Sequence, residues 1–321
     1  MAIISFAAIL VACAIFSTRT GASERINIIY PSISGLILGL WVTKDAGIFD
    51  KHGLDVNLIY IQSASAVMQA MLGGEAPIVL AGGSPVVDLG LEGGDTVFVG
   101  GIGVVPAFYI MTVPEIRSVE DLKNKPVGVT RFGSSSDFAM RKVLKKHRLE
   151  PVRDVPIIQI GGGMQGMAAA LLKRAIFAAP FSPPTNLDVE RGGGKLLVDM
   201  GKAGIAFPHV SVITTRGYIK KKRSVALAAL RAYSEGVKAM VSDKAFSLNV
   251  LKKYTRANDP EVLEATYKFA LDYIVRVPHP TREGIAEILR ESKNPKAKDA
   301  KPEQFIDDSL VRELEQSGLY R

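Results

Sequence analysis

The sequence has little of the residue types on which disulfide and metal chemistry depend. Cys13 is the only cysteine among the 321 residues, and it lies within an apolar leader. Once residues 1–22 are removed, the chain has no thiol, and therefore no disulfide and no cysteine metal site. The histidines stand singly and lack the spacing of metal ligands, at His52, His147, His209 and His279.

The leader is an apolar run over residues 2–16. At about 15 residues it is shorter than the roughly 20 that a membrane-spanning helix needs. Small residues follow at Thr20, Gly21 and Ala22. We predict that residues 1–22 are a signal peptide and that the mature protein is periplasmic. Two alternatives stay open, an uncleaved anchor helix and a lipoprotein in which a lipobox over residues 10–13 leaves lipid on Cys13.

Motifs of nucleophilic and nucleotide chemistry are also scarce. The sequence contains no G-x-S-x-G elbow and no P-loop lysine motif. Gly161–Gly166 satisfies G-x-G-x-x-G, with Asp188 about 20 residues further on. However, this motif lies mid-chain rather than in a first βαβ unit, and an exported protein has little access to NAD. We therefore predict a protein that is not an enzyme, with no catalytic residue, no cofactor and no metal.

The chain is basic, with a formal net charge of +8. Residues 1–22 contribute one charge, at Arg19, so the predicted mature chain carries +7. Much of the excess lies in residues 220–223 and 293–301, where no aromatic residues are interleaved. Such runs are typical of solvated loops. We expect no nucleic-acid partner and a monomer.

Short apolar strands alternate with amphipathic helices, which predicts an α/β protein with mostly parallel sheets. Strands are expected at 26–30, 55–61, 77–81, 96–100, 107–112, 126–130, 155–160, 176–179, 195–199 and 209–214. Helices are expected at 63–72, 84–91, 118–121, 134–147, 166–174, 185–191, 223–254, 259–274, 281–290 and 302–317. Trp41 and Phe49 are expected in the core.

Extended segments at 104–114 and 207–215 predict two lobes joined by two crossing hinge strands, with a ligand cleft between them. The first lobe is expected to combine 23–106 with 213–321, including the C-terminal helices. The second is expected over 107–212. Aromatic side chains near the expected cleft could stack on a flat ligand, namely those of Tyr109, Phe132, Phe181 and Phe207.

Small polar residues follow six expected strands, at 32–35, 62–65, 82–85, 133–136, 161–163 and 180–183. The carboxyl ends of strands are where open α/β sheets bind ligands, although ordinary helix capping would explain some of these residues. Arg131 is the only cationic candidate. The predicted ligand-binding residues are Ser34, Gly35, Ser63, Gly83, Ser84, Arg131, Gly133, Ser134, Ser135, Ser136, Gly162, Phe181 and Ser182.

Four segments, 41–56, 71–79, 116–129 and 178–184, together resemble the substrate-binding proteins of ABC transporters for nitrate, sulfonates, taurine and thiamine-precursor pyrimidines. The resemblance implies a type II periplasmic-binding-protein fold, whose two lobes close on a small organic or anionic ligand and deliver it to an ABC permease with a cytoplasmic ATPase. It implies ligand contacts at Ser34, Gly83, Ser84, Ser134, Ser135 and Ser182. The chain departs from the pattern at 173–177, where relatives usually carry a glycine-acidic pair.

Two alternatives accompany this interpretation. The same fold could serve a periplasmic sensor that docks on a receptor. A related family makes the thiamine pyrimidine and relies on a cysteine-rich iron site and an active-site histidine. The absence of cysteine from residues 23–321 disfavours that enzyme.

Overall fold

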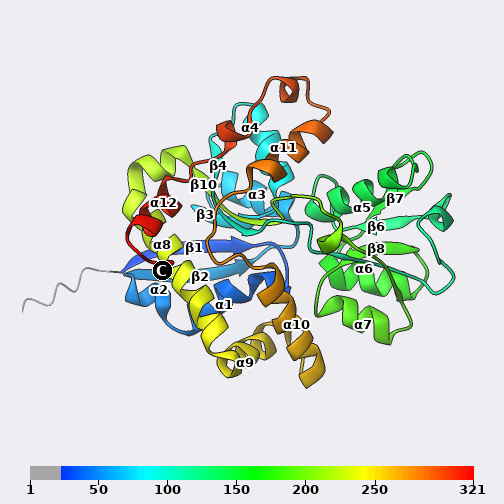
Figure 1. Ribbon diagram of the computed structural model, residues 1–321, viewed down its shortest axis with the longest axis horizontal. Coiled ribbons are helices and arrows are strands. Elements are labelled where there is room, and N and C mark those ends of the chain that lie inside the picture. Colours follow the sequence, from blue (N-terminus) through cyan, green and yellow to red (C-terminus); the bar gives the residue numbers. More distant parts are fainter. Residues whose placement is uncertain (1–22) are drawn as a thin grey trace, which may run out of the picture.

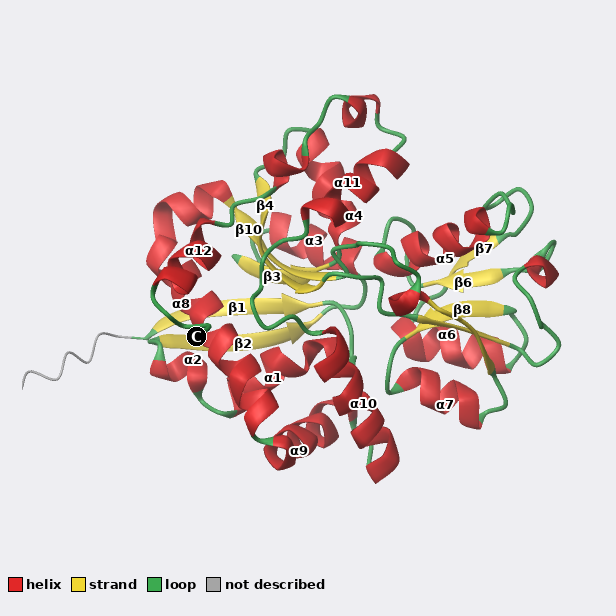
Figure 2. Ribbon diagram, viewed as in Figure 1, coloured by secondary structure: helices red, strands yellow, loops and turns green. Residues whose placement is uncertain are grey.

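The computed structural model describes residues 23–321. The predictions of a signal peptide over 1–22 and of lipid on Cys13 lie outside the described residues. Two β-sheets, each flanked by helices, form two lobes (Figure 1), and the strands of each lobe form a separate layer (Figure 2). The predicted two-lobe α/β class is confirmed.

The first sheet has the strand order β2-β1-β3-β10-β4. Its strands are β1 (Glu24–Tyr30), β2 (Leu54–Tyr60), β3 (Ile78–Ala81), β4 (Thr96–Gly103) and β10 (Val210–Thr215). β1 pairs in parallel with β2 and β3, whereas β10 runs antiparallel to both its neighbours. β3 is buried along its whole length, as expected for an apolar strand in a sheet with helices on both faces.

The second sheet repeats this plan in the order β7-β6-β8-β5-β9. Its strands are β5 (Tyr109–Thr112), β6 (Val127–Val129), β7 (Ile157–Gln159), β8 (Ala178–Phe181) and β9 (Lys195–Asp199). β6 pairs in parallel with β7 and β8, and β5 runs antiparallel to β8 and β9. All ten predicted strands are present, and each sheet is mostly parallel, as predicted.

Helices of the first lobe precede β4 or follow β10. They are η1 (Gly35–Ile37), α1 (Leu38–Asp45), α2 (Ile48–Lys51), α3 (Ala64–Leu72), α4 (Gly83–Leu91), α8 (Arg216–Ser242), α9 (Lys244–Thr255), α10 (Pro260–Tyr273), α11 (Arg282–Glu291), η4 (Pro295–Lys298), η5 (Pro302–Phe305) and α12 (Ser309–Gln316). The second lobe has η2 (Glu120–Leu122), α5 (Ser135–Lys146), α6 (Gly163–Leu172), α7 (Thr185–Arg191) and η3 (Met200–Lys202).

Two of the predicted helices are each divided into two helices in the structure. The helix expected over 223–254 is divided at Asp243, whose carboxylate accepts the N–H of Phe246 and starts α9. α8 begins earlier than predicted because Thr215 caps it, and it has a non-helical residue at Lys222. The helix expected over 302–317 is divided into η5 and α12, and Ile306, between them, forms a bridge to Phe98 of β4.

The core consists of three clusters of buried apolar side chains. One lies in the first lobe, and another fills the second lobe around β5, β6 and β8. The remaining cluster lies mostly in the first lobe and also includes Phe138 of α5. Trp41 and Phe49 are fully buried, which confirms that they belong to the core. Within residues 23–321, no helix is both long enough and apolar enough to cross a bilayer.

The chain passes between the sheets twice, after β4 and before β10. The two connections pair with each other. The N–H of Phe207 donates to the carbonyl of Val104 at 2.9 Å, and that of His209 donates to Gly103 at 2.9 Å. The predicted hinge segments, 104–114 and 207–215, contain Val104, Phe207 and His209, whereas Gly103 is the last residue of β4. The lobe boundaries stay a prediction.

Candidate functional site

A pocket lies between the lobes, where strands of both sheets end. Its first-lobe lining is Pro31, Ser32, Ile33, Ser34, Tyr60, Ser63, Ala64 and Gly82. Its second-lobe lining is Thr130, Ser134, Ser135, Ser136, Gly163, Met164, Gln165 and Ser182. The connections between the lobes add Phe108 and His209, and β10 adds Val210.

Several helices begin at this pocket. Ser34, Ser63, Gly82 and Ser134 are the N-caps of η1, α3, α4 and α5. The three serines cap their helices with side-chain oxygens, which accept N–H groups of residues 36, 66 and 137 at 3.3–3.5 Å. The ordinary capping role therefore holds for these serines. The same arrangement gives the pocket wall a positive partial charge, since helix N-termini carry unpaired amides.

Ser63 has a strained backbone, with φ 75° and ψ 140°. A non-glycine residue in such a conformation costs on the order of 1–3 kcal/mol and persists only where its surroundings hold it. Its N–H donates to the carbonyl of Pro31 at 3.1 Å, which holds the two strand ends of the first lobe together. Strain of this kind concentrates at ligand sites.

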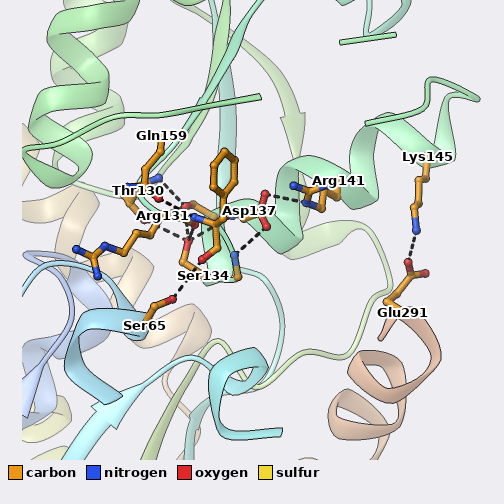
Figure 3. A network of polar contacts seen from close by, with 12 residues as sticks. Ser65, Thr130, Arg131, Ser134, Asp137, Arg141, Lys145, Gln159 and Glu291 are labelled. Carbon is orange, nitrogen blue, oxygen red and sulfur yellow. Dashed lines mark hydrogen bonds and ion pairs between the residues drawn. The ribbon is translucent and has the colours of Figure 1, made fainter. Parts of the chain in front are cut away.

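Three hydroxyl groups of the second lobe form a cluster at the start of α5 (Figure 3). The oxygens of Thr130, Ser134 and Ser136 lie 2.9–3.2 Å from one another. Ser134 donates to the carbonyl of Arg131 at 2.7 Å, and Ser136 accepts the N–H of Thr130 at 3.0 Å. These bonds orient the turn before α5 and satisfy most of the cluster internally.

Direct hydrogen bonds join the lobes around the pocket. Ser182 donates to Ser34 at 2.9 Å, and the N–H of Gly35 donates to Pro183 at 3.1 Å. Ser135 of α5 donates to the carbonyl of His209 at 3.3 Å. The two lobes are therefore closed upon each other in this structure.

His209 is the titratable side chain buried most deeply at the pocket. Burial lowers the pKa of its imidazole to about 3, so the ring is neutral near pH 7. Nδ1 accepts the N–H of Ala107 at 2.9 Å, which leaves the ring proton on Nε2. The ring packs against Phe108, with centroids 4.3 Å apart. In the sequence His209 is a lone histidine without the spacing of a metal ligand, and its place in a crossing segment is the signal that points to the pocket.

Among the described residues that line the pocket, none is Asp, Glu, Lys or Arg. Arg131, the predicted cation, is absent from the lining and donates to Gln69 of α3 at 3.3 Å. Figure 3 shows its side chain directed away from Ser134. The polar groups of the described pocket lining are therefore uncharged side chains and backbone amides.

The predicted stacking aromatics lie elsewhere. Phe181 is fully buried in the second-lobe core, and Phe207 stacks on Phe138 with centroids 4.0 Å apart. Tyr109 packs against Phe269, and Phe132 is 52% exposed. The aromatic side chains that do line the pocket are those of Tyr60 and Phe108.

The structure brings together six of the predicted ligand-binding residues, namely Ser34, Ser63, Ser134, Ser135, Ser136 and Ser182. It does not place the other seven in the pocket lining, namely Gly35, Gly83, Ser84, Arg131, Gly133, Gly162 and Phe181. Ser84 and Gly133 line a neighbouring cleft between α4, α5 and α11. A Cβ on Gly83 would lie 2.1 Å from Cγ of Pro208, so this glycine permits close packing against the connection between the lobes.

Ion pairs bridge the lobes at two opposite edges, where α5 faces α11 and α7 faces α10 (Figure 1). In the α5–α11 clasp, Lys142 contacts Glu287 and Glu291, and Lys145 contacts Glu291 at 2.5 Å. In the α7–α10 clasp, Arg191 contacts Asp259 at 2.6 Å. Burial alone would lower the pKa of Lys142, but the hydrogen bonds that its ammonium donates to the two glutamates outweigh burial and raise this pKa.

The family model described as NMT1/THI5 like matches residues 36–245. YtlA from Bacillus subtilis is 20% identical over 232 residues, which are 71% of this chain and 70% of YtlA.

Solved structures share the fold over most of the chain. A Bordetella bronchiseptica protein has a TM-score of 0.79 at 20% identity and covers 92% of this chain and 98% of its own. The MOPS-bound alkanesulfonate-binding protein SsuA of Xanthomonas axonopodis pv. citri has a TM-score of 0.71 at 18% identity, with 90% and 97% covered. The periplasmic nitrate-binding protein NrtA of Synechocystis has 0.73 at 14% identity, with 92% and 89% covered. The predicted periplasmic-binding-protein fold is confirmed, and the chain belongs to the NMT1/THI5-like family.

Proposed function

We propose that this protein is an extracytoplasmic solute-binding protein, which traps one small molecule between its lobes and delivers it to an ABC permease. The observation that carries the proposal is the pocket at the strand ends of both lobes, closed by the bond from Ser182 to Ser34. Trapping requires that the ligand bind the closed arrangement more tightly than the open one. A polar pocket whose walls come from two lobes meets that requirement.

The fold neighbours support this class of function. SsuA and NrtA are named as alkanesulfonate-binding and periplasmic nitrate-binding proteins. From these names and from the resemblance found in the sequence, we infer a ligand among sulfonates, nitrate, taurine, pyrimidines and aromatic acids. A binding role fits the pocket, whose described lining offers hydroxyl groups, amides and one neutral imidazole.

The experiment that tests the proposal is a thermal-shift screen of the purified protein against these ligand classes. A ligand that binds only the folded state raises the melting temperature by mass action. Ser135→Trp, which fills the pocket, should abolish the shift while leaving the fold intact. Ser242→Trp places the same side chain at an exposed position and serves as the control. An equal shift in wild type and Ser135→Trp would refute the placement of the site.

Location and partner are tested separately. We propose export to the periplasm, which cell fractionation and N-terminal sequencing would check. Cys13→Ser removes the only thiol, so retention of the variant in the membrane fraction would exclude lipid anchoring as the cause. Crosslinking of the ligand-loaded protein in cells distinguishes a permease partner from a sensor receptor.

A further inference from the structure

Three buried side chains of the pocket each have a hydrogen-bond donor for which the described residues provide no good acceptor. They are the side chains of Ser34, Ser63 and His209, each at most 7% exposed. Buried polar groups in folded proteins nearly always have partners, and a donor left without one costs about 1–3 kcal/mol. An inventory of their donors and acceptors therefore indicates what a ligand must supply.

His209 has a single proton on its neutral ring. Because Nδ1 accepts from Ala107, that proton is on Nε2, and the geometry gives Nε2 no hydrogen bond to another described residue. The carbonyl of Val105, which lies near the ring, accepts the N–H of Ala107 at 2.8 Å. The ring cannot exchange the roles of its two nitrogens without breaking the bond to Ala107. The connection between the lobes therefore fixes His209 as a donor.

Ser34 uses its oxygen as an acceptor twice, from the N–H of Leu36 at 3.3 Å and from the hydroxyl of Ser182 at 2.9 Å. The remaining acceptor near this serine pair, among the described residues, is the sulfur of Met164, 3.5 Å from Ser182. A thioether is a weak acceptor. One hydroxyl proton of the pair is therefore left for a ligand.

Ser63 accepts the N–H of Ala66 at 3.5 Å, and its own proton has no acceptor among the described residues. Its strained backbone holds the side chain at the pocket wall rather than in a relaxed turn. The same wall includes the amides at the start of α3, α4 and α5. All these groups are donors.

We infer that the pocket selects a ligand that presents hydrogen-bond acceptors and carries no cationic group, with His209 as the specificity-determining donor. This inference rests on the proposed binding function and narrows its list of ligands. A ligand ammonium would lose its water shell in the pocket and find no carboxylate there, because the described lining includes none. An oxyanion and a neutral ring with carbonyl oxygens share the required chemistry.

The test compares two probes that differ in the cationic group, together with a third probe that carries no charge. Ethanesulfonate and taurine share a sulfonate and a two-carbon chain, and taurine adds an ammonium; uracil is the uncharged probe. Dissociation constants are measured by calorimetry for wild type, His209→Gln and His209→Leu. The glutamine keeps an N–H donor and the leucine has none. His279→Gln, at a half-exposed histidine outside the pocket lining, is the control, and circular dichroism verifies that each variant folds.

We expect ethanesulfonate or uracil to bind at least about tenfold more tightly than taurine, and His209→Leu to weaken the better probe about tenfold or more. His209→Gln should retain most of the affinity. Tighter binding of the sulfonate identifies an oxyanion, and tighter binding of uracil identifies a neutral ring. Equal or tighter binding of taurine, or unchanged affinity in His209→Leu, would overturn the inference.

A second readout requires no ligand. Two-dimensional ¹H–¹⁵N spectra of the labelled protein, with His209→Leu used to assign the signal, report which ring nitrogen carries the proton. The inference requires a neutral ring with the proton on Nε2, and a proton on Nδ1 would refute it. If the ring is neutral with its proton on Nε2 and yet no probe binds, the proposed list of ligands is wrong, whereas the assignment of His209 as a donor is supported.

Discussion

Nδ1 of His209 accepts the backbone N–H of Ala107 at 2.9 Å, and this bond joins the two segments that connect the lobes. Its ring lines the pocket, while its carbonyl accepts from Ser135 of the second lobe. A ligand that contacts this ring therefore contacts one hinge segment directly and is linked to the other through the bond to Ala107. Binding and closure would be coupled through a single side chain.

The neutral state of His209 predicts a dependence of stability on pH. Burial lowers the pKa of the ring from 6.5 to about 3, so the unfolded state binds this proton at pH values where the folded state does not. The contribution is fully present above about pH 6.5 and is lost as the pH falls towards 3. We expect wild type to lose up to about 1.4 kcal/mol per pH unit relative to His209→Gln within that window. Urea denaturation at pH 7.5, 5.5 and 4.5 measures it, and a difference that does not change with pH would contradict it.

The α5–α11 clasp predicts that ligand affinity depends on salt. Glu291→Gln removes the charge that Lys142 and Lys145 share across the lobes. Partly exposed ion pairs contribute up to about 1 kcal/mol, so closure should weaken and the dissociation constant rise about twofold to fivefold. Titrations at low and high salt measure the effect, which should shrink as salt screens the pairs.

Glu115→Gln is the control for this experiment. Its carboxylate pairs with Arg174, and both residues lie in the second lobe. The substitution removes an ion pair without affecting closure. If both variants weaken binding equally, the clasp does not stabilise the closed lobes.

The close approach of the second lobe to Gly82 predicts that a larger side chain at this position obstructs closure of the lobes. A Cβ at this position would lie 2.0 Å from Oγ of Ser135, which belongs to the other lobe. Gly82→Ala should therefore hold the lobes apart, with a fall in ligand affinity of about tenfold or more and a normal fold. Gly73→Ala, where the nearest atom is at 3.4 Å, is the matched control. Small-angle scattering should show a wider molecule for Gly82→Ala with ligand, and full closure of this variant would sink the prediction.

The strained backbone of Ser63 predicts that its replacement raises the stability of the free protein and weakens ligand binding. Ser63→Gly relieves the positive φ of 75°, and glycine is a tolerable N-cap. We expect the free protein to become more stable by about 1 kcal/mol and the ligand to bind more weakly, since the hydroxyl donor is lost. Chemical denaturation and calorimetry on the same preparation measure both quantities. A variant that is less stable and binds equally well would show that Ser63 serves only as a cap.

The serines of the pocket could be predicted because they follow strands, and the carboxyl ends of parallel strands meet at one edge. The sequence does not reveal which residue of a strand end faces the pocket. Thr130 lines it whereas its neighbour Arg131 does not, as expected from the alternation of side chains along an extended chain.

Residues between the sheets were harder to predict. Phe108 and His209 lie on the two connections, and their approach to the pocket depends on the pairing of segments about 100 residues apart, which no local pattern indicates. Glycines at strand ends were predicted to contact the ligand. Gly83 instead allows the chain to pack closely against Pro208. The division of the long C-terminal helix at Asp243 had a local signal, since Asp is a common N-cap.

The bond between Phe207 and Val104 has a consequence for how this chain could be rebuilt. Because these residues lie 2.9 Å apart from nitrogen to oxygen, the intervening stretch leaves and re-enters the first lobe at almost the same point. An insertion with adjoining ends can be exchanged for a related one, or replaced by a short turn, with little demand on the surrounding chain. We therefore expect the second-lobe wall of the pocket to be exchangeable between relatives, and such chimeras would test ligand preference on an unchanged first lobe.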